Sequence, residues 1–182
     1  MLRKGRPTYH ISEPYLRFHH AVMRPRWSTL ERSGAAAEVW ADAEPTFRSA
    51  ILGPAFDDIT RAWLARYAAP AHVGGTLSEV GRTVFTDRAG RSRYEVDIVG
   101  LGQRDDGAIA VRVLGECKYG RILGMQDLRR LQRVRDLLAQ RVDVTDARLL
   151  LASGAGFSSE LRDAAVDPEI LLVDPERLYG GD

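Results

Sequence analysis

The stretch Arg93–Lys118, RYEVDIVGLGQRDDGAIAVRVLGECK, contains the pattern that decides the fold. Two runs rich in β-branched and apolar residues flank the dipeptide Asp106-Gly107. This dipeptide is typical of a two-residue hairpin turn, because both of its turn positions need a positive φ. We therefore expect the stretch to form an antiparallel β-hairpin.

A two-residue turn at this dipeptide places Asp97 opposite Glu116 and Glu95 opposite Lys118. Opposed residues project to the same side of a sheet, and alternation keeps residues i and i+2 there as well. The four charged side chains are therefore expected to converge on one face. The other face is expected to be core, made of Val96, Ile98, Val113 and Cys117.

Opposed carboxylates repel each other unless a cation lies between them. The oxygens of Asp97 and Glu116 suit a hard divalent ion, either Mg²⁺ or Mn²⁺. Lys118 beside them can pair with an acid or orient a water molecule. The alternative is a solvated edge hairpin, with a Glu–Lys pair that contributes under about 1 kcal/mol. The apolar run before GECK suggests a central strand and favours the metal site.

The rest of the chain predicts an α/β sandwich with a mixed central sheet flanked by helices, plus a short N-terminal helical extension. Helices are expected over residues 13–25, 44–69 (with a break at Gly53-Pro54) and 124–140, and strands over 80–87, 93–101, 108–118 and 169–174. ARLLLASGAGFSS is typical of a buried strand that leads into a capped helix. The expected domains are a docking segment over residues 1–43 and the main domain over 44–182. The expected apolar helix stripes are Tyr15, Phe18, His19 and Val22; Phe56, Ile59, Trp63 and Tyr67; and Leu128, Leu131, Val134 and Leu138.

Composition narrows the classes of function. The 182 residues carry a net charge of +1, so any nucleic-acid surface must be local. The single cysteine, Cys117, excludes an internal disulfide and a multi-cysteine zinc site. Residues 1–10 lack the apolar part of a secretory signal, and no stretch is long enough to span a membrane, so we expect a soluble, cytoplasmic protein. No dinucleotide or P-loop motif is present.

The spacing of Asp97, Glu116 and Lys118 resembles the PD-(D/E)xK, or restriction-endonuclease-like, nuclease superfamily. Within it, the chain resembles the C-terminal nuclease-like domain of archaeal and bacterial AAA-type ATPases. The segments that carry this resemblance are EPYLRFHHAVMRP, GPAFDD, YEVDIVG, GECKYG and LLLASGAGFSS, in the family's order and over most of the chain. Asp57 stands where the family usually has glutamate, and GRTVF replaces an expected tryptophan pair.

The resemblance implies a metal-dependent nuclease that hydrolyses DNA phosphodiester bonds as an endonuclease. Asp97, Glu116 and the backbone carbonyl of Cys117 would hold Mg²⁺, with Mn²⁺ as a substitute. Lys118 would position the attacking water. Asp57 would hold a metal-bound water or a second ion, although an acid that stabilises a helix start is an equal alternative.

Two other functions stay open at this stage. The chain is alternatively a catalytically silent DNA-docking or regulatory C-terminal domain of a AAA-type ATPase, or a purely structural interaction domain. The expected partners are DNA, an ATPase domain or subunit, and a second copy of the chain. Secondary candidates are Glu95 and Gln126 near the site, and the helix arginines Arg129, Arg130, Arg133 and Arg135, for which a solvated face paired with Asp127 and Asp136 is the favoured interpretation.

Overall fold

The computed structural model describes residues 11–87, 91–104 and 106–180. The chain divides into two compact units, residues 1–55 and 56–182. The predicted domain boundary after residue 43 stays a prediction. The basic start of the chain, residues 1–10, where no secretory signal is expected, lies outside the described residues. Across the described ranges, no helix is long and apolar enough to cross a bilayer.

The first unit is helical. It contains α1 (Pro14–Phe18), α2 (Trp27–Leu30) and α3 (Ala36–Phe47), with π-helical turns at His19–Met23 and Arg48–Leu52. The first helical run ends at Met23, close to Pro25 as predicted. Pro25 lies in a 3₁₀ segment, Arg24–Arg26, and Arg26 (φ −117°, ψ 18°) leaves the helical region before α2 begins.

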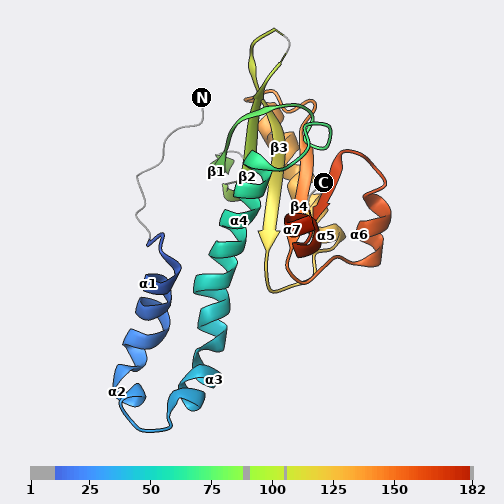
Figure 1. Ribbon diagram of the computed structural model, residues 1–182. Coiled ribbons are helices and arrows are strands. Elements are labelled where there is room, and N and C mark those ends of the chain that lie inside the picture. The colour runs from blue at the N-terminus through green and yellow to red at the C-terminus, as the bar shows by residue number, and fades with distance from the viewer. Residues whose placement is uncertain (1–10, 88–90, 105, 181–182) are drawn as a thin grey trace. The chain divides into compact units, whose positions relative to one another are not determined.

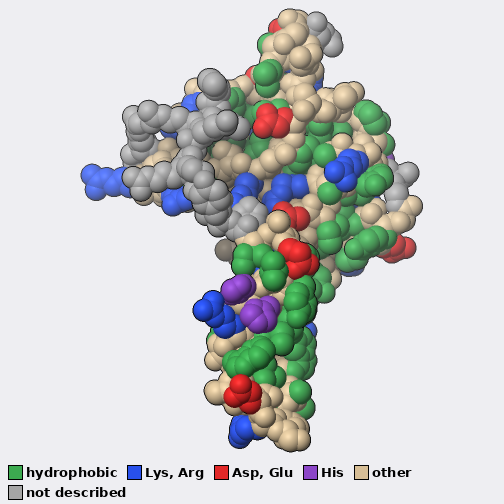
Figure 2. Space-filling model, turned by 60° about the vertical axis from the view of Figure 1, so that its left-hand side comes forward, with side chains coloured by type: hydrophobic (Ala, Val, Ile, Leu, Met, Phe, Trp, Pro, Cys, Tyr) green, Lys and Arg blue, Asp and Glu red, His purple; other side chains and the backbone are tan. Residues whose placement is uncertain are grey.

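The core of the first unit is small. Val22, Ala43 and Ile51 are buried, and they are flanked by half-buried aromatic residues that include Phe18. Tyr15, expected on the buried stripe, is 63% exposed. Figure 2 shows hydrophobic side chains (green) and neighbouring histidines (purple) at the surface of these helices. The two histidine rings, His19 and His20, meet edge to face with centroids 5.3 Å apart.

The second unit contains a five-stranded mixed sheet in the order β1-β2-β3-β4-β5 (Figure 1). Its strands are β1 (Leu77–Asp87), β2 (Ser92–Gln103), β3 (Ile109–Lys118), β4 (Arg148–Ser153) and β5 (Ile170–Val173). The first three strands pair antiparallel, whereas β3, β4 and β5 run parallel. The predicted α/β fold with a mixed central sheet is confirmed.

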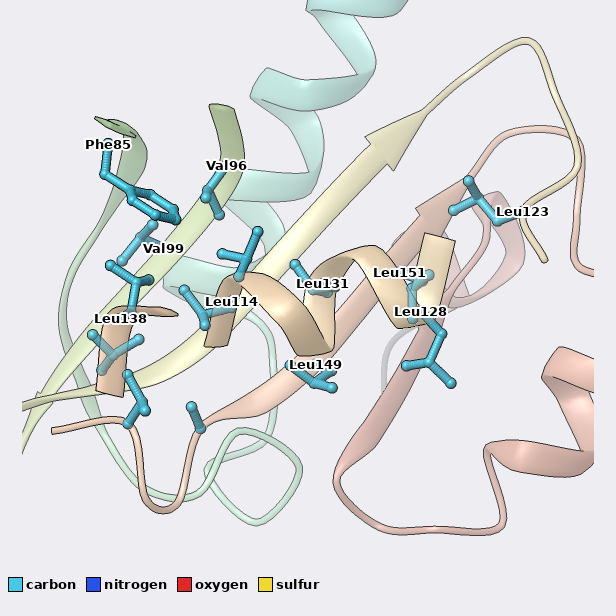
Figure 3. Close-up of a cluster of buried hydrophobic side chains, with 14 of the residues drawn as sticks. Phe85, Val96, Val99, Leu114, Leu123, Leu128, Leu131, Leu138, Leu149 and Leu151 are labelled. Carbon is cyan, nitrogen blue, oxygen red and sulfur yellow. The ribbon is translucent and has the colours of Figure 1, made fainter. Parts of the chain in front are cut away.

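Helices pack on both faces of this sheet. On one face, α5 (Met125–Ala139) and α6 (Ser159–Ala164) cover an apolar cluster that includes Val99, Leu114 and Leu149 (Figure 3). The predicted α5 stripe is confirmed, since it contributes the buried side chains Leu128, Leu131, Val134 and Leu138. As predicted, the hydroxyl of Ser158 caps the start of α6.

The opposite face packs against α4 (Gly53–Arg66) and α7 (Pro175–Gly180), through residues that include Phe56, Trp63, Ile98, Leu150 and Leu178. The predicted stripe of α4 was partly wrong, because Ile59 is 40% and Tyr67 67% exposed. Thr60 and Leu64 are buried instead. The Thr60 hydroxyl donates to the carbonyl of Phe56 at 2.8 Å, which removes the cost of burying an unpaired hydroxyl.

The β2–β3 hairpin has the predicted register near its open end but not at its turn. The loop closes between Arg104 and Ala108, whose backbone groups hydrogen-bond at 2.9 Å, so the two-residue turn was wrong. Gly107 there has φ +81°. A β-bulge follows, because Gly100 pairs with Val113 but Leu101 pairs with Val111. The extra residue, Arg112, restores the predicted register for the pairs beyond it.

A second bulge lies on the other side of β2. Gly81 pairs with Val99 and Thr83 with Val96, so two residues of β2 stand opposite Arg82. These two residues are Asp97 and Ile98. A bulge breaks the alternation of faces. Val96 therefore belongs to the cluster beneath α5, whereas Ile98, Val113 and Cys117 belong to the cluster beneath α4, and the prediction that all four share one face was wrong.

Candidate functional site

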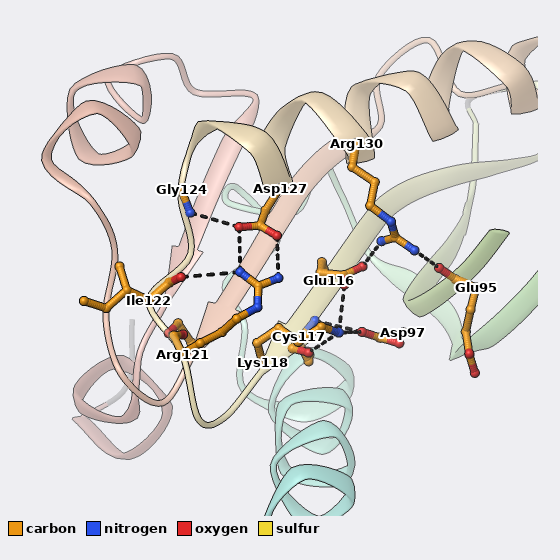
Figure 4. Close-up of polar contacts among 11 residues, drawn as sticks. Glu95, Asp97, Glu116, Cys117, Lys118, Arg121, Ile122, Gly124, Asp127 and Arg130 are labelled. Carbon is orange, nitrogen blue, oxygen red and sulfur yellow. Dashed lines mark hydrogen bonds and ion pairs between the residues drawn. The ribbon is translucent and has the colours of Figure 1, made fainter. Parts of the chain in front are cut away.

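The ammonium group of Lys118 lies among three oxygen atoms at the end of β3 (Figure 4). Its Nζ is 2.7 Å from Glu116 Oε1, 2.9 Å from the carbonyl oxygen of Cys117 and 3.1 Å from Asp97 Oδ2. These are the three residues that the sequence predicts as metal ligands. The structure brings their oxygens together around a single positive charge.

The bulge explains how Asp97 reaches this position. The ladder between β2 and β3 ends at the pair Ile98–Gly115, and the backbone N–H of Cys117 beyond it donates to Asp97 Oδ2 at 3.1 Å. The side chain of Asp97 thus takes the place of a main-chain acceptor. Arg61 of α4 donates to the main-chain carbonyl of Asp97 at 2.9 Å and so holds the bulged backbone from the other side.

Glu116 is the most deeply buried acid of the site, with 5% of its surface exposed. One carboxylate oxygen contacts Lys118, and the other forms an ion pair with Arg130 Nη1 from α5. The second terminal nitrogen of Arg130 donates to the carbonyl oxygen of Glu95 at 3.1 Å. A carboxylate withdrawn from water this far costs several kcal/mol unless cations or donors satisfy it, and here each oxygen has one.

Asp57 of α4 is the second acid whose environment is unusual. Its pKa rises to about 6, mainly because burial disfavours the charged form and secondarily because the negative charge of Asp97 is near. The positive charges of Arg61 and Lys118 oppose this shift without cancelling it. A role at a helix start does not fit, because the N–H of Gly53 already donates to Arg48 and α4 has no acid in its first turn.

The side chain of Cys117 is a core residue, as predicted, but it does not point away from every acid, because Asp57 of α4 lies near enough for its charge to act on the thiol. Its thiol is buried in the cluster beneath α4, and burial, followed by the charges of Asp57 and Asp97, raises the pKa of the thiol well above its usual range. Such a thiol is a packing group rather than a nucleophile. The backbone N–H of Cys117 donates to Asp97, and its carbonyl accepts from Lys118.

Several secondary candidates do not join this cluster. The carboxylate of Glu95 points away from Lys118 in Figure 4, and only its backbone carbonyl takes part. Gln126 is an exposed residue in the first turn of α5. Arg135 pairs with Glu169 at 2.9 Å, and Arg129 and Arg133 are exposed.

Sequence reasoning missed the role of Arg130. The expected partner of the helix arginines, Asp127, instead pairs with Arg121 of the preceding loop at 2.6 Å. One signal was available: a buried Glu116 needs cations for both oxygens, and Lys118 supplies only one. The arginine that contacts the second oxygen is determined by how α5 packs over β3, and the sequence pattern of α5 alone does not predict this packing.

The donor set suits a hard divalent cation. Within the described ranges, no group of three or more His, Cys, Asp and Glu side chains is arranged to hold a metal ion. The predicted set differs from such a group, because it combines two carboxylates with a backbone carbonyl. All three donors are oxygens, as Mg²⁺ and Mn²⁺ prefer, and they already converge on the cationic Nζ of Lys118.

The family model described as "Archaea bacterial proteins of unknown function" (DUF234) matches residues 19–131, and the chain belongs to this family. The matched range includes Asp57, Asp97, Glu116, Lys118 and Arg130. No curated protein matches the sequence.

Solved structures with a partial likeness include a repair endonuclease from Pyrococcus abyssi, with 16% identity and a TM-score of 0.34 over 52% of this chain and 38% of that chain. EndoMS in its apo form gives 13% identity and a TM-score of 0.39 over 67% and 45%. Protein VC1899 from Vibrio cholerae gives 12% identity and a TM-score of 0.43 over 92% and 48%. The chain therefore spans less than half the length of each of these proteins.

Proposed function

We propose that this protein is a metal-dependent nuclease that hydrolyses DNA phosphodiester bonds as an endonuclease. One observation supports this proposal above all others. Two acidic side chains and a backbone carbonyl, from a bulged strand and its neighbour, surround the Lys118 ammonium at 2.7–3.1 Å. A solvated edge hairpin does not fit Glu116, which is 5% exposed and lies on the central strand of the sheet.

In the proposed site, Asp97, Glu116 and the Cys117 carbonyl would hold Mg²⁺ or Mn²⁺ at the position that the Lys118 ammonium now occupies. The bound ion would polarise the scissile phosphate and lower the pKa of the attacking water. Lys118, once displaced from the three oxygens, remains next to them because its own backbone continues β3. Its three N–H donors can then orient the water and stabilise negative charge on the phosphate.

Asp57 suits the task of accepting the proton from that water. A general base works best when its pKa lies near the operating pH, and the pKa of Asp57 is raised to about 6. In the metal-free protein, burial produces this shift and the negative charge of Asp97 strengthens it. Arg61 lies on α4 together with Asp57 and donates to the carbonyl of Asp97, so this hydrogen bond links the helix and the strand that carry the two acids.

The test is a cleavage assay with purified wild-type protein and Lys118→Ala. Supercoiled plasmid, linear duplex and single-stranded DNA are each incubated with Mg²⁺, with Mn²⁺ and with EDTA. We expect wild type to cut with either metal, EDTA to stop it, and the variant to lose at least about 100-fold in rate. Nicked plasmid appearing before linear plasmid indicates single-strand cuts, whereas direct conversion to linear DNA indicates two copies acting together.

The same assay separates the proposal from its rival. A folded wild-type protein that binds DNA in a gel-shift experiment but cuts no substrate with either metal would instead support a DNA-docking or regulatory domain of a AAA-type ATPase. Metal-independent cutting, or equal cutting by Lys118→Ala, would contradict the proposed site.

A further inference from the structure

We infer that Arg130 is a positioning residue, which fixes Glu116 so that its oxygen Oε1 is presented to the cation. This inference rests on the proposed function, since it concerns the same site. Arg130 lies on α5, outside the hairpin that carries Asp97, Glu116 and Lys118. It would contact neither the metal nor the substrate, and would act through Glu116.

The two oxygens of Glu116 are divided between two cations. Arg130 Nη1 binds Oε2, and Lys118 Nζ binds Oε1 at 2.7 Å. Only Oε1 therefore faces the position shared with Asp97 Oδ2 and the Cys117 carbonyl. A carboxylate can rotate about its last torsion almost freely, because that torsion has broad minima. The ion pair with Arg130 removes this freedom and selects one oxygen as the ligand.

Arg130 is itself held at a second point. Its Nη2 donates to the main-chain carbonyl of Glu95 at 3.1 Å, two residues before the bulged Asp97. One planar guanidinium thus connects α5 to Glu116 of β3 and to the β2 backbone just before the bulge. The neighbouring residue on α5, Leu131, is 1% exposed and packs the apolar face of this helix against the sheet. Lysine cannot replace this fork, because a single ammonium lacks two donors in a fixed plane.

A simpler role for Arg130 makes the opposite prediction. If the guanidinium only neutralised a buried carboxylate, it would compete with a metal ion for the charge of Glu116. Its removal would then strengthen metal binding. A positioning role predicts weaker binding, because the ligand oxygen is no longer oriented. Residues that orient metal ligands typically contribute about 10–100-fold in metal affinity.

The experiment measures Mn²⁺ binding to the full chain by isothermal titration calorimetry, without DNA. We expect Arg130→Gln to weaken the dissociation constant about 10–100-fold. Arg130→Lys, which keeps the charge but not the fork, should recover only part of this loss. The matched control is Arg133→Gln, which removes the same charge from an exposed position on the same helix and should change the constant less than about twofold.

The outcomes separate this inference from the proposed function. Wild-type protein that binds no Mn²⁺ would overturn both. Wild type that binds Mn²⁺, with Arg130→Gln binding equally or more tightly, would overturn the inference and leave the nuclease proposal standing. If Arg130→Gln fails to fold, Arg130→Lys decides the question alone, and wild-type affinity in that variant would overturn the inference.

Discussion

Glu116 and Asp57 are two carboxyl groups of one site that differ in their immediate partners. Glu116 is the more buried, and both of its oxygens contact cations, Lys118 and Arg130. Asp57 lies on α4, where burial and the charge of Asp97 outweigh the positive charges near it, and its pKa rises to about 6. Burial is common to both acids, and what differs is direct contact with a cation.

Under the proposed function, this difference would let one site contain both a metal ligand and a proton acceptor. A carboxylate whose two oxygens each contact a cation is held in place, and it can exchange one of those cations for a metal ion. A carboxyl group that is buried beside another acid has a raised pKa, so it can exchange its proton with water closer to neutral pH. Four substitutions test this distinction, and the effect that we expect is largest for Lys118→Met and smallest for Glu95→Gln.

Replacing Lys118 with methionine removes one of the two cations from Glu116 and should give the largest effect. Cleavage should fall at least about 100-fold, because the group that orients the water is gone. Mn²⁺ affinity should rise about tenfold, because the metal no longer has to displace an ammonium from the three oxygens. Parallel rate measurements and calorimetric titrations check this. Weaker Mn²⁺ binding in Lys118→Met would show that Lys118 does not occupy the cation position.

Changing Gly115 to alanine should disturb the backbone that places Glu116 beside Asp97. An added Cβ would lie 2.9 Å from Ile98 Cβ and 3.3 Å from Leu150 Cβ, at the last pair of the β2–β3 ladder. Overpacking of this kind typically costs about 1–3 kcal/mol in the free energy of unfolding. Urea denaturation measures it. The matched control is Gly120→Ala, where an added Cβ meets nothing within 4 Å; an equal loss there would show that the effect is not overpacking.

The sequence predicts the elements of the second unit well, because strong periodic patterns and turn residues define them. The predicted register at Asp97 and Glu116 agrees with the structure for a less direct reason. The predicted turn was wrong by one residue, and the bulge at Arg112 cancels that error before the strands reach Gly115. The prediction that Asp97 and Glu116 lie near each other thus agrees with the structure because of two compensating irregularities.

The parts that could not be predicted depend on tertiary packing. A bulge at Asp97 and Ile98 has no local sequence mark here, yet it moves Val96 and Ile98 to different cores and brings Asp97 to the Cys117 N–H. The contact between Arg130 and Glu116 joins residues of two elements and requires the docking of α5. The raised pKa of Asp57 likewise arises only from the burial that the fold creates.

Changing Asp57 to asparagine tests the proton-holding acid. The pKa of Asp57 in the folded protein is raised from 3.8 to about 6, so the folded state holds a proton that the unfolded state has already lost between these pH values. Wild-type stability therefore falls as pH rises from about 4 to 6, and asparagine does not titrate. We expect Asp57→Asn to be more stable than wild type by about 1 kcal/mol at pH 8, a value reduced for partial exposure.

Thermal denaturation of both proteins from pH 3.5 to 8, without metal, measures this difference. The two melting curves should converge as the pH falls to 3.5, where Asp57 is protonated in the folded state and mostly protonated in the unfolded state. A difference that is independent of pH would show that Asp57 does not titrate in this range, and the proposed base would lose its support.

Glu95→Gln should give the smallest effect and defines the limit of the site. The Glu95 carboxylate points away from Lys118, and only its backbone carbonyl contacts Arg130, which a glutamine retains. The free energy of unfolding should change by less than about 0.5 kcal/mol, and the Mn²⁺ dissociation constant by less than about twofold. Calorimetry on the variant provides both comparisons with wild type. A loss of Mn²⁺ affinity of more than about tenfold would make Glu95 a fourth ligand, beside Asp97, Glu116 and the Cys117 carbonyl. The comparison of Glu116 with Asp57 would then describe only part of the site, because an acid with an exposed side chain would have to turn inward when the metal binds.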